Sequence, residues 1–189
     1  MSRYLLHNLI ALRKEFIMDS KTNFLGIDSL SDMTKAAVVA ALYVVLTAAF
    51  APLSFGAVQF RFAEGFNVLS IFNKRYIVAV TLGCFIANLI STVGPIDLVA
   101  GTFETFINLI TIYFGTKLIK SMAGKMVFSV ISSTFYMFII AWEIAIVGST
   151  AFWPTFWSAY LTCAVGEFVT VALGAIIFYF VNQHYDLSK

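Results

Sequence analysis

The sequence predicts an all-α integral membrane protein: a transmembrane bundle of six helical segments, of which the second is short. Hydrophobic residues make up 60% of the 189 residues and charged residues only 12%, whereas a soluble domain usually carries about 25% charged residues. The mean hydropathy is +0.90. A chain of this length holds about six spans of roughly 20 residues each, joined by short loops. The composition leaves no room for a separate soluble domain.

The segment before the first apolar run is expected to lie outside the bundle. Its leucines have helical spacing, but Arg13 and Lys14 interrupt them and no small-residue cleavage site follows, so the segment does not have the pattern of a signal peptide. An interfacial amphipathic helix and a disordered, dispensable leader are both compatible with it. We predict a cytoplasmic leader, a six-helix membrane domain and a cytoplasmic tail at residues 1–33, 34–182 and 183–189.

Turn-forming and charged residues separate the apolar runs. Pro52 and Gly56 follow the first run, and the second run is too short to cross a bilayer as a straight helix. We expect it to re-cross together with the preceding loop, with irregular backbone beside a cavity. Pro95 is expected at a helix start. The predicted segments are 34–50, 62–72, 76–93, 96–116, 126–147 and 155–180.

The basic residues predict the orientation of the chain in the cell membrane. With both termini in the cytoplasm, the loops at 74–75 and 117–125 are cytoplasmic as well, and Arg61 alone of the 12 basic residues faces the other side. This is the distribution of the positive-inside rule. A basic residue on the outer side needs a group that interacts with its charge, and for Arg61 this would be Glu64 or a ligand.

Charged residues also lie in or beside the apolar segments. The expected topology places acids from four different helices in the outer half of the bundle. Charges at membrane depth are costly, so they usually line a cavity or pair with another group. We therefore predict a polar ligand site that opens on the outer face. Its charged candidates are Arg61, Glu64, Asp97, Glu104, Glu143 and Glu167.

Structural roles remain open for some of these residues. Arg61 and Glu64 have the spacing of a local ion pair at a helix start. Asp97 has the position of a helix cap, and Glu143 lies close enough to the interface to be solvated. Glu104 and Glu167 are predicted to lie deeper, where a structural carboxylate would need a partner, so we expect them to face a ligand or water.

Aromatic and small residues provide two further candidates. Three tryptophans near the outer end of the last two segments have the position of an interfacial belt, although Trp157 is also placed to stack on a flat ligand. Small residues at the cytoplasmic end of the first segment form a face that lets a partner helix approach closely. These residues are Ala36, Ala37, Ala40 and Ala41.

The sequence contains little that would support catalysis or metal binding. His7 and His184 lie in the tails, and Cys84 and Cys163 fall in apolar runs without metal or disulfide spacing. We therefore predict no catalytic residue and no metal site. Loop lysines account for the net charge of +2, which does not indicate nucleic-acid binding. The chain has no phosphate-binding glycine loop.

Three runs of residues resemble a known family. The runs TKAAVVAALYVVLT at 34–47, APLSFGAVQFRFAE at 51–64 and LGCFIANL at 82–89 are similar to those of the queuosine-precursor transporter (QueT) family, a group of substrate-binding S components of energy-coupling factor (ECF) transporters. The resemblance covers about residues 34–182 and implies the six-helix S-component fold. It also implies uptake from outside the cell by toppling on a membrane coupling protein, EcfT. Two partner ATPases would use ATP, this chain would need no cofactor, and the alanine face would dock on EcfT.

The ligand implied by the resemblance is a 7-deazaguanine such as queuine or 7-aminomethyl-7-deazaguanine. A guanine edge presents two parallel N–H donors to one carboxylate, and Glu167 or Glu104 is the candidate. The cationic aminomethyl group needs a second carboxylate, for which we select Glu143 or Asp97. The remaining candidates are donors to the ligand carbonyl and a stacking ring, namely Gln59, Arg61, Asn88 and Trp157.

Other interpretations of the same residues remain open. An S component for another vitamin, such as thiamine, would have the same fold. A stand-alone proton-coupled transporter would use the buried glutamates as a proton relay. An intramembrane enzyme is disfavoured because the predicted bundle contains no histidine.

Overall fold

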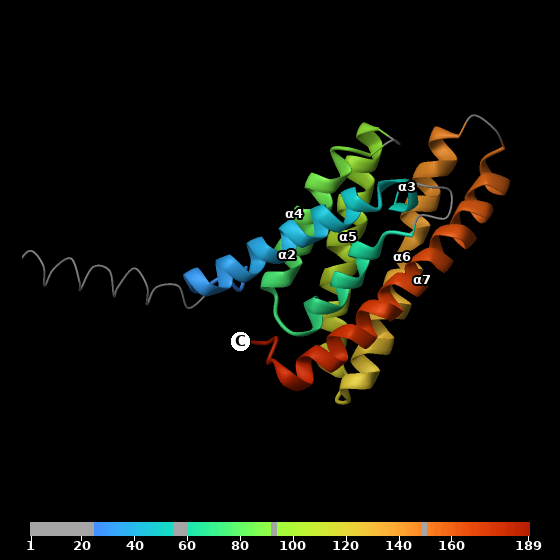
Figure 1. Cartoon of the computed structure of the whole chain (residues 1–189). Coiled ribbons are helices and arrows are strands. Elements are labelled where there is room, and N and C mark those ends of the chain that lie inside the picture. Colours follow the sequence, from blue (N-terminus) through green and yellow to red (C-terminus); the bar gives the residue numbers. More distant parts are fainter. Residues whose placement is uncertain (1–24, 55–59, 92–93, 149–150) are drawn as a thin grey trace, which may run out of the picture.

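The computed structural model describes residues 25–54, 60–91, 94–148 and 151–189, and these residues form helices without a strand (Figure 1). The segment 1–24 and Gln59 lie outside the described residues. The elements are α2 (Leu30–Ala49), α3 (Ala51–Ser54), the 3-10 helix η2 (Phe62–Ile71), α4 (Arg75–Asn88), α5 (Pro95–Gly115), the 3-10 turn η3 (Thr116–Leu118), α6 (Met122–Val147) and α7 (Phe152–His184).

Four of the described helices are long and apolar enough to cross a membrane. They are Leu30–Ala49, Pro95–Leu118, Met122–Val147 and Phe152–His184. α4 is apolar but has 14 residues, fewer than the roughly 20 that a straight span needs. It ends at Asn88, so the predicted helix over 76–93 is too long. The chain is thus an all-helical protein with several apolar helices of spanning length, and six crossings remain a prediction.

Helix starts follow local capping signals. The side chain of Ser29 accepts a hydrogen bond from the Asp32 backbone N–H at 3.1 Å, which caps α2 a few residues before the expected start. Pro95 occupies the first position of α5, as predicted. The side chain of Asp97 does not cap this helix, because the residue before the helix is Gly94 and no side-chain cap bond forms there.

The second segment is a buried 3-10 helix of ten residues, η2. Runs of this length are uncommon for 3-10 helices. η2 contacts α2, α4, α5, α6 and α7, so it lies inside the bundle (Figure 1). Non-α-helical backbone is tolerated at membrane depth when protein surrounds it. This segment therefore projects side chains into the interior from a position that a lipid-facing helix does not offer.

Two glycines bring η2 close to α7. A Cβ on Gly174 would lie 2.5 Å from the Cα of Gly65 and would also contact the Gly65 carbonyl oxygen. Backbone atoms cannot move aside as a flexible side chain can, so position 174 requires glycine. This contact sets η2 directly against α7, and it places side chains from the two elements within reach of each other.

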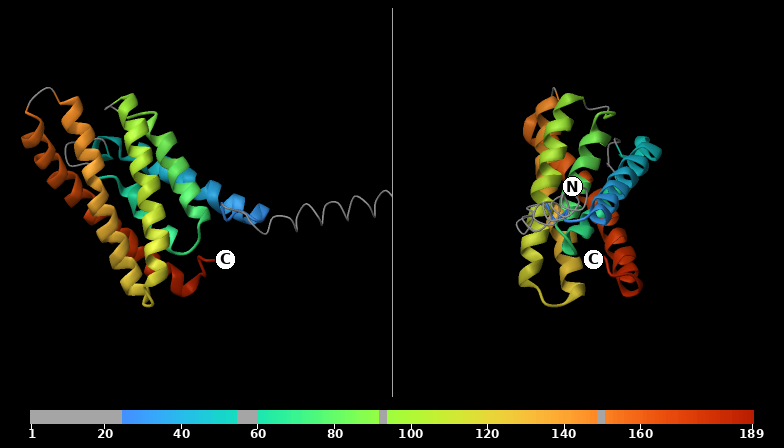
Figure 2. Two further views of the ribbon diagram at one scale, coloured as in Figure 1. Left: turned by 180° about the vertical axis from the view of Figure 1, so that it is seen from behind. Right: turned by 90° about the vertical axis from the view of Figure 1, so that its left-hand side faces the viewer.

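The remaining packing closes the end of the molecule where η2 and α4 meet. Buried Arg75 forms an ion pair with Asp32, and the Tyr76 hydroxyl donates to the carbonyl oxygen of Leu187 at 3.3 Å. The C-terminal residues therefore lie against the starts of α2 and α4. Figure 2 shows this arrangement from behind and from the side, with α6 packed on α7 and α2 on α4.

Candidate functional site

The charged residues singled out in the sequence lie together inside the bundle. All six are buried, with exposed fractions between 2% and 7%. They come from the start of η2 and from α5, α6 and α7. We call this group the acidic cluster: Arg61, Glu64, Asp97, Glu104, Glu143 and Glu167.

Arg61 is the cation of the acidic cluster. Its Nη1 lies 3.5 Å from Glu64 Oε1 and its Nη2 lies 3.9 Å from Asp97 Oδ2. It also interacts electrostatically with the three deeper acids, Glu104, Glu143 and Glu167. One guanidinium therefore faces five carboxyl groups, so acidic groups outnumber the basic group within the cluster.

Glu64 is the best-satisfied acid of the cluster. It accepts hydrogen bonds from the Tyr43 hydroxyl, from Asn67 Nδ2 at 2.8 Å and from Arg61 Nη1 at 3.5 Å. Three donors therefore satisfy the oxygens of this buried carboxylate. Glu64 is thus held in place from α2 and η2, where it contacts both Arg61 and Asn67.

Sequence reasoning missed Tyr43 and Asn67. Both side chains are fully buried. Asn67 had a detectable signal, because it is an amide inside an apolar run, three residues after Glu64. Tyr43 had none, because a tyrosine in an apolar helix does not indicate which way its hydroxyl points.

The deeper acids have far fewer donors. Glu104 Oε2 accepts from the Thr105 hydroxyl at 3.4 Å, whereas Glu104 Oε1 has no hydrogen-bond partner among the described residues. Glu167 Oε1 accepts from Asn67 Nδ2 at 3.5 Å. Neither oxygen of Glu143 has a partner within the described ranges. Buried acceptors without donors are costly, so these three side chains are suited to receive donors from a ligand.

A second set of contacts surrounds Cys84 on α4. The Thr105 hydroxyl donates to Cys84 Sγ at 3.2 Å, and Asn88 Nδ2 donates to Cys84 Sγ at 3.4 Å and to the Asp97 carbonyl oxygen at 3.2 Å. Both amide hydrogens of Asn88 are thereby engaged, and its Oδ1 is unpaired among the described residues. Asn88 was predicted to donate to a ligand carbonyl; the geometry instead leaves its acceptor available.

The structure does not bring Trp157 into the cluster. Its side chain is 56% exposed, and its ring lies 5.1 Å from that of Phe156 and 6.3 Å from that of Tyr160. Trp142 and Trp153 are also exposed, at the same end of α6 and α7. This grouping resembles an interfacial aromatic belt, and it gives no support to ring stacking by Trp157.

The four alanines of α2 divide between two faces. Ala36 and Ala40 are buried, and the absent side chain of Gly83 lets α4 approach the Ala40 carbonyl oxygen and the Tyr43 ring. Ala37 and Ala41 are exposed. The first pair therefore packs inside this chain, and the second pair is available to another molecule.

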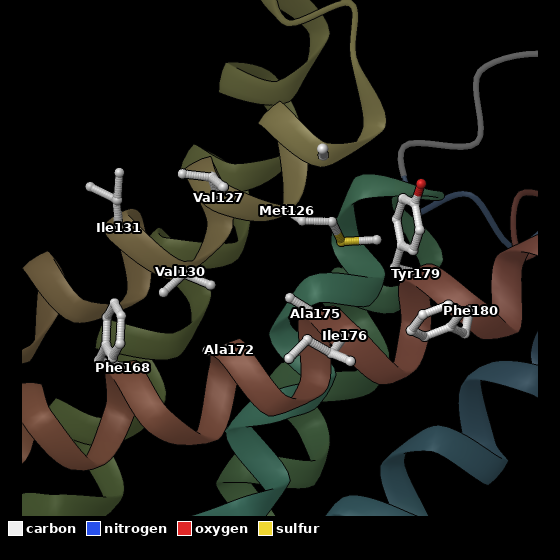
Figure 3. A pocket seen from close by; sticks show the side chains of 11 residues that line it. Met126, Val127, Val130, Ile131, Phe168, Ala172, Ala175, Ile176, Tyr179 and Phe180 are labelled. Carbon is white, nitrogen blue, oxygen red and sulfur yellow. The ribbon is translucent and has the colours of Figure 1, made fainter.

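Within the part of the chain that the structure describes, the acidic cluster has almost no exposed surface. A cavity of about 570 Å³ lies elsewhere, between α6 and α7, and is lined by apolar side chains such as Met126, Val130 and Phe168 (Figure 3). A second, of about 260 Å³, includes Glu143 among otherwise apolar residues. No group of three or more His, Cys, Asp and Glu side chains in the described parts of the chain is arranged to hold a metal ion.

Comparison with known proteins identifies the family. A family model described as QueT transporter matches residues 33–183. The chain is also 36% identical over 171 residues to the protein named Queuosine precursor transporter QueT of Lactococcus lactis subsp. cremoris (strain MG1363), a match that covers 84% of this chain and 96% of the relative. No solved structure gives a significant match. The chain therefore belongs to the QueT transporter family.

Proposed function

We propose that this protein is the substrate-binding S component of an ECF-type importer. It captures a queuosine precursor, queuine or 7-aminomethyl-7-deazaguanine, at the outer face of the cell membrane and delivers it inward by toppling on an ATP-driven coupling module. Membership of the QueT transporter family supports the transport role, and the relative's name supports the substrate. The observation that carries the proposal is the buried acidic cluster with oxygens that have no hydrogen-bond partner among the described residues.

The chemistry of the cluster matches a donor-rich cation. The unpaired atoms of Glu104, Glu143, Asn67 and Asn88 are all oxygens that accept hydrogen bonds. A 7-aminomethyl-7-deazaguanine presents ring and amino N–H donors and a cationic amine, and charge-assisted hydrogen bonds to carboxylates are the strong ones. A ligand rich in acceptors or negative charge would leave these oxygens unsatisfied.

The hydrogen bonds and ion pairs that each acid already makes within the protein suggest which part of the ligand it contacts. Glu104 and Glu167 lie close enough to interact electrostatically, and we assign one of them to the guanine edge. Glu143 is the better candidate for the amine, because Asp97 is already engaged with Arg61 and with the Ser91 hydroxyl. Glu64 serves to hold Arg61, whose guanidinium remains the candidate donor to the ligand carbonyl.

The first test is a calorimetric titration of the purified protein with queuine, 7-aminomethyl-7-deazaguanine, guanine and thiamine. We expect saturable binding of a deazaguanine and much weaker binding of guanine. Binding of thiamine alone would identify an S component for another vitamin. Uptake into vesicles without ATPases, abolished when the proton gradient is collapsed, would instead support a stand-alone proton-coupled transporter. Folded protein that binds neither deazaguanine would refute the substrate assignment.

The exposed alanine pair of α2 supports docking on a coupling protein. Small residues allow two membrane helices to approach closely, and Ala37 and Ala41 face outward on a helix whose other exposed residues are mainly apolar. We place this end of α2 at the cytoplasmic side, with both termini in the cytoplasm, and the partners are EcfT and two ATPases that bind ATP.

Replacing Ala37 with leucine is expected to reduce co-purification with EcfT and the ATPases severalfold, because a larger side chain separates the helices. Ligand binding by the isolated chain should not change. Val99→Leu is the matched control, since Val99 is an exposed apolar residue on α5, a different helix. Equal recovery of the partners with Ala37→Leu and with the control would argue against this docking face.

A further inference from the structure

The side chain of Asn67 is held by hydrogen bonds to two acids of the acidic cluster. Its side chain is fully buried on η2, inside the acidic cluster. Its Nδ2 donates to Glu64 Oε2 at 2.8 Å and faces Glu167 Oε1 at 3.5 Å. Its Oδ1 has no hydrogen-bond partner among the described residues. The amide thus connects the anchored acid to a deeper, poorly satisfied one.

The orientation of this amide follows from the charges around it. Side-chain amides are often ambiguous, because nitrogen and oxygen can exchange places. Here a flip would turn Asn67 Oδ1 toward the carboxylate oxygens of Glu64 and Glu167, which are themselves acceptors. The donor end must therefore face the acids, and the oxygen must face the other way, as a buried acceptor without a donor.

Tyr43 keeps the frame around Asn67 rigid. Its hydroxyl donates to Glu64 Oε1, so the two oxygens of Glu64 are held from different elements. A Cβ on Gly83 would lie 2.8 Å from the Cβ of Tyr43, which shows how closely this side chain is seated against α4. Packing and hydrogen bonds that lock supporting side chains are what hold a binding group in a defined geometry.

We propose that Asn67 is a specificity-determining residue of the site: its Oδ1 accepts a hydrogen bond from an exocyclic N–H of the transported ligand, on its 2-amino or its aminomethyl group, while Tyr43 and Glu64 position it. The inference rests on the proposed function. The ligand class is a flat heterocycle or amine that presents an N–H at this point. An oxygen or nitrile nitrogen there would meet an acceptor and leave both groups unpaired, which is costly in a buried site.

Affinity measurements with paired ligands test this role. The ligands are 7-aminomethyl-7-deazaguanine, 7-deazaguanine, which lacks the aminomethyl group, and 7-aminomethyl-7-deazahypoxanthine, which lacks the 2-amino group. We expect Asn67→Ala to weaken the first ligand about tenfold. One of the two analogues lacks the donor that faces Asn67, so wild-type protein should bind it more weakly and Asn67→Ala should cause no further loss. Asn67→Ser provides the same comparison if the alanine variant does not fold.

Tyr43→Phe is the matched control, because it removes a hydrogen bond from Glu64 without removing one from the ligand. We expect it to weaken all three ligands by the same factor. If Asn67→Ala also weakens all three equally, or weakens none, the contact role of Asn67 is refuted while the proposed function stands. If wild-type protein binds none of the three, the proposed function fails and this inference fails with it.

Discussion

Replacing Arg61 with methionine is expected to lower the stability of the protein by about 3–5 kcal/mol, as when one partner of a buried ion pair is removed. The guanidinium lies between Glu64 and Asp97 and interacts with the three deeper acids. Without it, five buried carboxyl groups have no cation. Thermal unfolding of purified protein in detergent is the measurement, and binding of 7-aminomethyl-7-deazaguanine should be lost as well.

Two companion variants make the Arg61 result specific. Lys117→Met removes an exposed basic residue and should leave stability nearly unchanged. The double variant Arg61→Met with Glu64→Gln should recover part of the loss, because neighbouring partners do not contribute additively. Wild-type stability in Arg61→Met would mean that the ion pairs of the cluster do not hold the bundle together.

Glu104→Gln and Glu167→Gln are each expected to weaken binding of 7-aminomethyl-7-deazaguanine about 10- to 100-fold, the effect of losing a hydrogen bond to a charged group. Thermal stability should stay the same or rise. Both carboxylates are buried with few donors, and an amide costs less to bury than an undersatisfied charge. Calorimetric titration and thermal unfolding of the same preparations measure the two effects.

Glu64→Gln is the contrasting variant. Glu64 has three hydrogen-bond donors, so its replacement should lower stability more than either of the deeper changes. If Glu104→Gln and Glu167→Gln destabilise the protein and leave binding intact, these two acids are structural and the ligand assignment is wrong.

The helices and the burial of the acids were predictable because their signals are local. Apolar runs predict where helices lie, and Pro95 marks the start of α5. The acids at Glu104 and Glu167 stand out because charge is rare in such runs. The length of α4 was overestimated, since Leu89 and Ile90 are apolar but continue past the helix end in a turn. Hydropathy does not distinguish helix from turn there.

The division of the alanine face was not predictable from spacing. A small-xxx-small pattern identifies residues that allow close approach, but it does not say which molecule approaches. Ala36 and Ala40 are buried in the same chain, where the Ala40 carbonyl oxygen lies against α4, whereas Ala37 and Ala41 are exposed. The small-xxx-small pattern therefore contains one pair of alanines that packs within this chain and one pair that is exposed.

The sequence by itself determined the membrane class, most of the helical segments and the six charged residues of the acidic cluster, because hydropathy and charge act along the chain and need no knowledge of partners. It did not predict that Arg75, expected in a loop, is buried against Asp32. The tertiary structure decided which acids receive hydrogen bonds from the protein and which have oxygens left for a ligand. The Tyr43–Glu64 and Asn67–Glu167 contacts join residues that are 21 and 100 positions apart. Such pairs arise only when η2 packs inside the bundle against α2 and α7, and that packing depends on the close contact between Gly65 and Gly174.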